Sequence, residues 1–392
     1  MPQKTLLIAA LFSAGLAHAG TGFTTLPFTP DSLSADGKSV VGEDWNSNRL
    51  WTWNATAGQV FIGGVTSINP GAGTAVISAD GSRIGANALD PVTGKSRPSY
   101  YDVASSTWTA LPDYGSATAG SGGVYGSTGS VWAMSSNGNY IAGYAYSGGS
   151  AQTNVRASIW NVQTGTLTNL GSSGLSGPNA QTRVNGISDN GLVAGGRGAN
   201  NNAMVWTDLD GDGSYTTSTI ANEGMVMAVS ADGSWLGGIG GSATGNAAYR
   251  YNVQTKTVES LGLTNASSRG GTVSAMSADG SVIVGFEDYG AGSPQERVGF
   301  IWRAGIGIQS FDSFLASYGI DTGNTLNFAT PMDVSADGQT FTGFGYPPGS
   351  STGEGWYVSL AGLAPVPEAS SFTLLMAGLG VLGLVARRRR AG

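Results

Sequence analysis

The sequence predicts an all-β fold, a seven-bladed β-propeller of four-stranded antiparallel blades, and three observations lead to this prediction. A turn segment ending in Asp-Gly or Asn-Gly recurs seven times, at intervals of roughly 40–60 residues. Each copy precedes a short apolar strand and then a third strand that carries an aromatic residue. Glycine accounts for 64 of the 392 residues and charged residues for 11%, a composition typical of many short strands joined by tight turns.

Each turn segment is interpreted as the turn of a β-hairpin. Asp-Gly and Asn-Gly favour a tight type I′ turn because both residues tolerate positive φ, and apolar residues alternate on either side. The turn segments are residues 33–37, 77–81, 134–138, 187–191, 229–233, 276–280 and 334–338. The second strand then ends in a glycine, assigned as Gly42, Gly85, Gly143, Gly195, Gly237, Gly285 and Gly343. The third-strand aromatic residues are Trp53, Tyr101, Trp160, Trp206, Tyr251, Trp302 and Trp356.

The two ends of the repeat region are complementary. Residues 23–26 have the character of a fourth strand, whereas the last unit ends at its third strand, residues 355–358. We therefore expect the N-terminal strand to complete the last blade, which closes the ring and removes an open sheet edge. No helix is expected between the two terminal segments. A β-helix is the alternative fold, although its rungs are much shorter than this period.

The residue types that are missing limit the chemistry of this chain. Without cysteine there are no disulfides, thiolate nucleophiles or cysteine-bound metals. The only histidine is His18, near the N-terminus, so the rest of the chain has no Ser-His-Asp triad, histidine-bound zinc or histidine-bound haem. Without the terminal segments, 13 basic and 24 acidic residues give a net charge of −11, which disfavours nucleic acid as a partner.

Residues 1–19 are predicted to be a secretory signal peptide. Lys4 supplies the positive charge, residues 6–16 form an apolar run too short to span a bilayer, and residues 17–19 (Ala-His-Ala) give a cleavage site. A buried N-terminal helix is the alternative. The propeller domain is expected at residues 20–363, followed by a separate segment at residues 364–392.

The repeat units resemble a family of exported bacterial proteins. Residues 130–141, 180–195 and 271–286 combine the Ser-Ala-Asp-Gly turn with the glycine and aromatic strand positions, and they are similar to HAF repeats. The resemblance covers most of residues 22–360. The histidine of the His-Ala-Phe element is missing throughout, and residues 299–302 (Gly-Phe-Ile-Trp) are the nearest match. No function that depends on that histidine is expected here.

The C-terminal segment resembles the PEP-CTERM sorting signal, which combines a Pro-Glu motif, a transmembrane segment and an arginine cluster. The transmembrane segment is expected at residues 372–386, where its short apolar stretch suits transient anchoring in the inner membrane. The matching residues are Val366, Pro367, Glu368, Arg387, Arg388, Arg389 and Arg390. The positive-inside rule keeps such arginines in the cytoplasm and places the domain outside the inner membrane. The resemblance implies cleavage near the Pro-Glu motif by an exosortase, a membrane transpeptidase, and a final location at the cell surface or outside the cell. A permanent single-span anchor is the alternative.

Propeller topology predicts where ligands would bind. The loops between second and third strands share one face with the loops between blades, which we call the long-loop face, and loops on a rigid scaffold commonly bind ligands. Two blades carry carboxylates beside an aromatic residue there, a combination that suits sugar rings. These candidate residues are Glu43, Asp44, Trp45, Glu287, Asp288 and Tyr289. The alternative is that they are solvated loop acids beside a half-buried aromatic ring.

A candidate calcium site lies in a turn of the fourth blade. Asp208, Asp210 and Asp212 alternate with Leu209 and Gly211, as oxygen ligands and a turn glycine do in calcium loops. The twelfth position of such a loop is Thr219 rather than a glutamate. The alternative is a plain turn rich in Asp and Gly, and the repeat aspartates Asp36, Asp80, Asp232, Asp279 and Asp337 are expected to have such a structural role.

Together these features predict an exported, envelope-sorted, non-catalytic surface or extracellular-matrix protein, and the resemblance of the C-terminal segment to the PEP-CTERM signal implies that it binds or is associated with exopolysaccharide. The alternative is a histidine-free polysaccharide hydrolase or lyase that uses carboxylates on the long-loop face. A glycoside hydrolase would require two carboxylates about 5–10 Å apart in one cleft. No cofactor is expected, apart from the candidate calcium ion.

Overall fold

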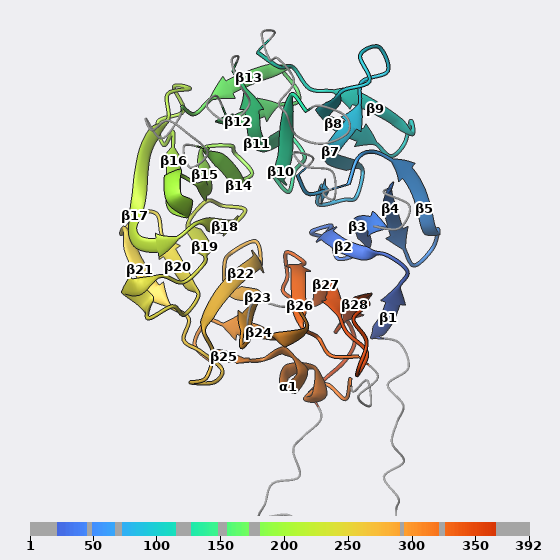
Figure 1. Cartoon of the computed structure of the whole chain (residues 1–392), viewed down its shortest axis with the longest axis vertical. Coiled ribbons are helices and arrows are strands. Elements are labelled where there is room, and N and C mark those ends of the chain that lie inside the picture. The colour runs from blue at the N-terminus through green and yellow to red at the C-terminus, as the bar shows by residue number, and fades with distance from the viewer. Residues whose placement is uncertain are drawn as a thin grey trace, which may run out of the picture.

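The fold is an all-β propeller of seven four-stranded antiparallel sheets arranged around a central channel (Figure 1). The computed structural model describes residues 22–44, 49–66, 73–114, 127–147, 155–171, 181–290, 294–320 and 326–365. The predicted signal peptide, Trp45, the segment at residues 372–386 and the sorting-signal residues lie outside the described residues. The prediction of a seven-bladed propeller is confirmed.

Each blade runs from an inner strand at the channel to an outer strand at the rim. Blade 1 comprises β2 (Thr29–Leu33), β3 (Ser39–Asp44), β4 (Arg49–Asn54) and β5 (Gly58–Gly63). Blade 2 comprises β6 (Val76–Ile77), β7 (Arg83–Leu89), β8 (Ser96–Asp102) and β9 (Thr107–Ala110). Blade 3 comprises β10 (Gly129–Met134), β11 (Tyr140–Tyr146), β12 (Val155–Asn161) and β13 (Thr166–Asn169). Blade 4 comprises β14 (Arg183–Ile187), β15 (Val193–Arg197), β16 (Asn202–Thr207) and β17 (Thr216–Gly224).

The remaining blades follow the same order. Blade 5 comprises β18 (Val226–Val229), β19 (Trp235–Gly238), β20 (Tyr249–Asn252) and β21 (Thr257–Ser260). Blade 6 comprises β22 (Gly270–Met276), β23 (Val282–Asp288), β24 (Arg297–Arg303) and β25 (Gly307–Ser310). Blade 7 comprises β26 (Thr330–Val334), β27 (Thr340–Gly345), β28 (Glu354–Ser359) and, at the rim, the N-terminal strand β1 (Phe23–Leu26). The described residues also form short 3₁₀ turns, η2 (Ala199–Asn201), η3 (Ser242–Thr244) and η4 (Pro294–Glu296).

The ring closes through β1, as predicted. This strand pairs antiparallel with β28, so that Thr25 lies opposite Trp356 and Leu26 opposite Gly355. The Ser359 N–H donates to the Gly22 carbonyl at 2.7 Å. Blade 7 therefore combines strands from the two ends of the described chain, and its outermost strand, β1, is paired with β28.

Six of the seven inner strands contain a β-bulge, which places one extra residue opposite the second strand. The bulged residues are Asp31, Trp132, Asn185, Met227, Ser274 and Met332. All six line the central cavity of about 310 Å³, which residues of all seven inner strands enclose. The bulges therefore aim one side chain of each of these six blades into the channel.

The bulge also explains the second-strand glycine. In blade 4, Gly196 lies opposite Val184, just before the bulge, and a Cβ at Gly196 would overlap the Arg183 carbonyl oxygen. Blades 4 and 5 use Gly196 and Gly238 at this position, one residue after the predicted Gly195 and Gly237. In blade 2 the predicted Gly85 is likewise one residue early, and Ala86 follows it.

The third-strand aromatic position is confirmed in six blades and is wrong in the seventh. In those six blades the aromatic residue faces the third residue after the turn glycine, as Trp53 faces Val40. In blade 7 the third residue after the turn glycine is Phe341, and Val358 lies opposite it. Trp356 lies opposite Gly343. Trp356 instead packs against Phe311, with ring centroids 5.4 Å apart.

The turns are confirmed as hairpins but are not of type I′. Only the glycine, such as Gly37, has positive φ, whereas Asp36 does not, and the Gly37 N–H donates to the Ser34 carbonyl. The Asp36 carboxylate accepts from the Lys38 N–H at 3.0 Å and from the Ser34 hydroxyl at 2.6 Å. The same Ser–Asp–amide arrangement recurs in blades 2, 5, 6 and 7, as expected for structural aspartates.

Hydrogen bonds join the turns of neighbouring blades into a closed ring, which we call the turn ring. Six of the seven contacts are between main-chain groups, and the Ala336 N–H donates to the Ala35 carbonyl at 2.8 Å across the closing position. Between blades 3 and 4, side chains make the contact instead, as Asn137 Nδ2 donates to the Asp189 carbonyl at 2.7 Å. The turn ring thus fixes the blade spacing on the face opposite the long loops.

One helix interrupts the described part of the propeller, contrary to the prediction. Helix α1 (Phe311–Ala316) follows the rim strand of blade 6, and the Ser310 hydroxyl caps it by accepting from the Ser313 N–H. Phe311, Phe314 and Leu315 are buried and fill the space between blades 6 and 7. Within the described residues, no helix has both the length and the apolar character required to cross a membrane.

Candidate functional site

The two predicted carboxylate clusters are not equivalent in the fold. Counted from the turn glycine, Glu43 occupies the position of Phe286, and Asp44 occupies that of Glu287. Because successive side chains of a strand point to opposite faces, Glu43 and Glu287 point to opposite sides of their blades. The similar sequences therefore place their carboxylates in different surroundings.

Glu287 holds a loop against blade 6. Its side chain is fully buried, and its carboxylate accepts from the Thr264 N–H, the Thr264 hydroxyl and the Tyr289 hydroxyl, each at 2.7 Å. Burial is the main cause of the raised pKa of Tyr289. Asp288 forms an ion pair with Arg297 at 3.2 Å. These contacts give the cluster a structural role, and ligand binding by it remains a prediction.

Glu43 and Asp44 instead line an open cavity on the long-loop face. This cavity of about 430 Å³ lies between blades 1 and 7, and its other lining residues include Phe344, Tyr346 and Glu354. Glu43 itself is buried, whereas Glu354 is exposed. The structure thus brings one of the two predicted clusters next to aromatic side chains, although Trp45 lies outside the described residues.

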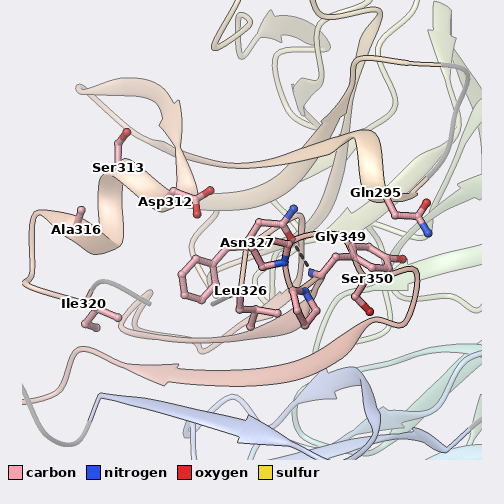
Figure 2. A pocket seen from close by; sticks show the side chains of 13 residues that line it. Gln295, Asp312, Ser313, Ala316, Ile320, Leu326, Asn327, Gly349 and Ser350 are labelled. Carbon is pink, nitrogen blue, oxygen red and sulfur yellow. Dashed lines mark hydrogen bonds between the residues drawn. The ribbon is translucent and has the colours of Figure 1, made fainter. Parts of the chain in front are cut away.

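A second cavity, of about 480 Å³, lies on the other side of Tyr346. Figure 2 shows Asp312 of α1 on one side of it, Gln295 and Ser350 on the other, and Asn327 between them. Tyr346 lines both cavities, so they adjoin at this side chain. We call the two cavities together the Tyr346 groove.

The main chain of Tyr346 is held in place by Asn327. The Tyr346 N–H donates to Asn327 Oδ1 at 2.7 Å, and the Asn327 N–H donates to the Tyr346 carbonyl at 3.2 Å. Phe344 packs edge-on against the Tyr346 ring at 6.1 Å between centroids. Burial raises the pKa of the Asp312 carboxyl, against a hydrogen bond from the Phe328 backbone that lowers it.

The Tyr346 groove combines an aromatic ring with amide, hydroxyl and carboxyl groups. A ring offers a flat apolar surface, and the polar groups supply both donors and acceptors for sugar hydroxyls. Sequence reasoning identified the acids of blade 1 but missed Asp312, Asn327 and Gln295. These residues come from α1, the segment after it and a loop of blade 6. The only sequence signal for the helix is its capping residue, Ser310, which the sequence analysis did not use.

The predicted calcium turn joins β16 to β17, as expected. The carboxylate oxygens of Asp208, Asp210 and Asp212 lie within 4.8 Å of one another. Asp208 is buried and accepts from the Asp212 N–H at 3.1 Å and the Gly213 N–H at 3.0 Å, which are contacts of a turn. The geometry fits both a plain turn and a weak calcium site, so calcium binding remains a prediction.

Replacing Asp208, Asp210 and Asp212 together by Asn tests this site. Calcium bound to the folded state would raise thermal stability by mass action. Because position 219 offers no carboxylate, we expect calcium to raise the melting temperature of the wild-type chain by less than about 2 °C. Melting curves in calcium and in chelator would measure the difference. A rise of several degrees that the triple variant loses would instead establish a true calcium site.

Comparisons with known proteins identify the C-terminal signal and the fold. Residues 365–390 match the PEP-CTERM protein-sorting motif, which indicates an exported protein sorted by an exosortase. A search of curated protein sequences finds no match. A chain of the mitotic checkpoint complex is 17% identical with a TM-score of 0.50, covering 91% of this chain and 99% of that chain. An oligogalacturonate lyase in complex with manganese is 12% identical with a TM-score of 0.52, covering 88% of this chain and 91% of that chain. These similarities show the fold alone.

Proposed function

We propose that this chain is a non-catalytic surface or extracellular-matrix protein that binds exopolysaccharide in the Tyr346 groove. The observation that carries the proposal is the groove itself, an open polar cavity on the long-loop face that a fixed tyrosine divides. The sorting motif supports export and surface sorting, where extracellular polymers are the available partners. The net charge of −11 for the exported part of the chain disfavours nucleic acid as the ligand.

An open groove suits a polymer better than a small molecule. Its two cavities extend from Glu43 in blade 1, past Tyr346, to Asp312 beside blade 6. A chain of sugars lying along it would contact the ring of Tyr346 at the centre and polar side chains at both ends. Aromatic residues at the centre of a contact surface contribute most of the binding free energy.

Replacing Tyr346 with Ala is expected to weaken polysaccharide binding about tenfold, from the loss of the central aromatic contact. The fold should persist, because main-chain groups of this residue bind Asn327. Retention in affinity gels that contain neutral or acidic polysaccharides would measure binding, after a glycan array has selected the polymers.

Phe61→Ala provides the matched control for this experiment. Phe61 is 48% exposed on the rim of blade 1, away from the groove, so its removal should leave retention unchanged. Equal retention of the Tyr346→Ala and wild-type chains would contradict the proposed site. Release of new reducing or unsaturated chain ends from the polymer would contradict the non-catalytic assignment.

A further inference from the structure

Two arginines lie opposite each other at the long-loop end of blade 4. Arg183 begins β14, Arg197 ends β15, and the two residues are directly opposite in the strand register. Directly opposed residues of an antiparallel pair place their side chains on the same face of the sheet. These ends of the two strands lie toward the long-loop face, and the Arg183 side chain contacts Trp132 and Asn185 of the cavity wall, at the mouth of the channel on that face.

No acidic side chain neutralises this pair within the described residues. The ion pairs found there involve Lys38, Arg97, Arg250 and Arg297, and neither Arg183 nor Arg197 takes part in one. Segments 115–126, 148–154 and 172–180, which complete the long-loop connections of blades 3 and 4, contain no Asp or Glu. These three segments thus supply no counter-charge, and the carboxylate of Glu223 in β17 accepts from the Gly241 N–H and the Thr244 hydroxyl instead.

The contacts of the two side chains are with neutral groups. Arg183 Nε donates to Asn185 Oδ1 at 2.7 Å, and Arg197 Nε is buried without a hydrogen-bond partner among the described residues. Burial, followed by the charge of Arg197, lowers the pKa of Arg183 to about 10. Opposed like charges destabilise a sheet, so the pair costs folding free energy that an anionic ligand would offset.

An aromatic surface lies beside the arginines. The Arg183 guanidinium stacks on the Trp132 ring, 3.5 Å from its centroid, and Trp132 and Asn185 are both bulged residues that line the channel cavity. Tyr144 of β11 packs edge-on against Tyr146 at 5.6 Å between centroids, next to Arg183. Stacking on Trp132 holds the planar guanidinium in one orientation, which suits two parallel hydrogen bonds to a carboxylate.

The opposite wall of the cavity carries acceptors. Asp31 and Asp333 line it from blades 1 and 7, which lie across the ring from blade 4 (Figure 1). Asp31 Oδ2 has no hydrogen-bond partner within the described residues. The cavity therefore has Trp132 and Asn185, both in contact with Arg183, at one side and acceptors for hydroxyl groups at the other, and its 310 Å³ fit one or two sugar rings.

We propose that this mouth of the channel is a second binding site, in which Arg183 and Arg197 bind the carboxylate of an acidic sugar that stacks beside Trp132. The site is separate from the Tyr346 groove. The proposal implies that the exopolysaccharide contains acidic sugars, and in that respect it rests on the proposed function.

Calorimetric titration of the full chain with trimannuronate, and with neutral mannotriose as the comparison sugar, tests the proposal. We expect binding of trimannuronate only, weakened at least about tenfold by Arg183→Gln and by Arg197→Gln. Arg49→Gln is the control, because Arg49 lies on blade 1 against Phe61 and its loss changes the net charge equally. Its affinity should stay within about twofold of the wild-type value.

Stability of the free chain separates binding from a structural role. Removing one of two opposed charges should leave the melting temperature of Arg197→Gln equal to or above that of wild type, while its affinity falls. A lowered melting temperature with unchanged affinity would overturn the proposal, as would equal binding of mannotriose or no binding of trimannuronate. If trimannuronate binding requires Arg183 but polymer retention does not depend on Tyr346, the proposed function of the Tyr346 groove is contradicted and the site at Arg183 and Arg197 is supported.

Discussion

Deletion of residues 22–27 is expected to open the propeller. These residues include β1, which supplies the rim of blade 7, the buried Leu26 and the contact of Phe23 with Phe328 at 5.8 Å. Each buried apolar side chain contributes about 1.5–3 kcal/mol and each strand hydrogen bond about 1 kcal/mol. Their sum is comparable to the 5–15 kcal/mol that typically stabilises a domain, so we expect cooperative unfolding to be lost.

A circular permutant separates the role of the strand from that of the chain end. New termini in the connection at residues 67–72, with Ser359 joined to Gly22 by a short linker, keep all four strands of blade 7. These two residues already share a main-chain hydrogen bond of 2.7 Å, so the linker need not strain the blade. The permutant should melt as the wild type does in circular dichroism. A deletion variant with a wild-type melting curve would show that closure does not depend on β1.

The free energy of unfolding should fall as pH rises from about 4.5 to 7, and Asp333 should account for about 2 kcal/mol of this fall. Burial raises the pKa of Asp333 to about 6, although hydrogen bonds from the Leu33 and Val334 backbone and the Ser32 hydroxyl lower it. A carboxyl whose pKa is raised on folding stabilises the fold while it is protonated. That contribution is complete below the unfolded pKa and is lost as pH rises through about 6.

Asp333→Asn should remove this pH dependence. The amide cannot titrate, and any change in its contacts with Ser32 and Leu33 adds a constant offset. Asp80→Asn is the control, because hydrogen bonds from the backbone and hydroxyl of Ser82 lower the pKa of Asp80. Its contribution is lost only as pH falls below its usual range, so its profile should stay parallel to wild type above about pH 5. Parallel profiles for Asp333→Asn and wild type in urea unfolding would contradict the assignment.

The architecture could be predicted because it depends on local patterns. Turn residues and apolar alternation specify hairpins, and the phase of residues 23–26 indicated the missing strand of blade 7. Register could not be predicted to the residue, because the bulges insert one residue that no local pattern marks. In blade 7 the third strand was assigned by its tryptophan, so Trp356 was given the position that Val358 occupies, and α1 was missed despite its capping serine.

The candidate sites depend on contacts between distant segments, which sequence reasoning could not supply. The acids of blade 1 and blade 6 looked alike, yet one residue of register places Glu43 by the groove and buries Glu287 against Thr264. Arg183 and Arg197 are fourteen positions apart and carry no motif. Only the strand pairing of blade 4 shows that their charges meet.

The turn ring has a consequence for how this chain can evolve. A hydrogen bond between main-chain groups survives almost any side-chain replacement, and only proline removes the donor. At six of the seven contacts, therefore, sequence drift cannot easily change the angle between neighbouring blades. The exception is the contact between blades 3 and 4. There the residue types matter, because the Ser136 and Asn137 side chains bind Asp189. Repeats held together in this way can diverge until only the Ser, the Asp or Asn and the Gly of each turn remain alike, while the opposite face is free to acquire new loops and new ligands.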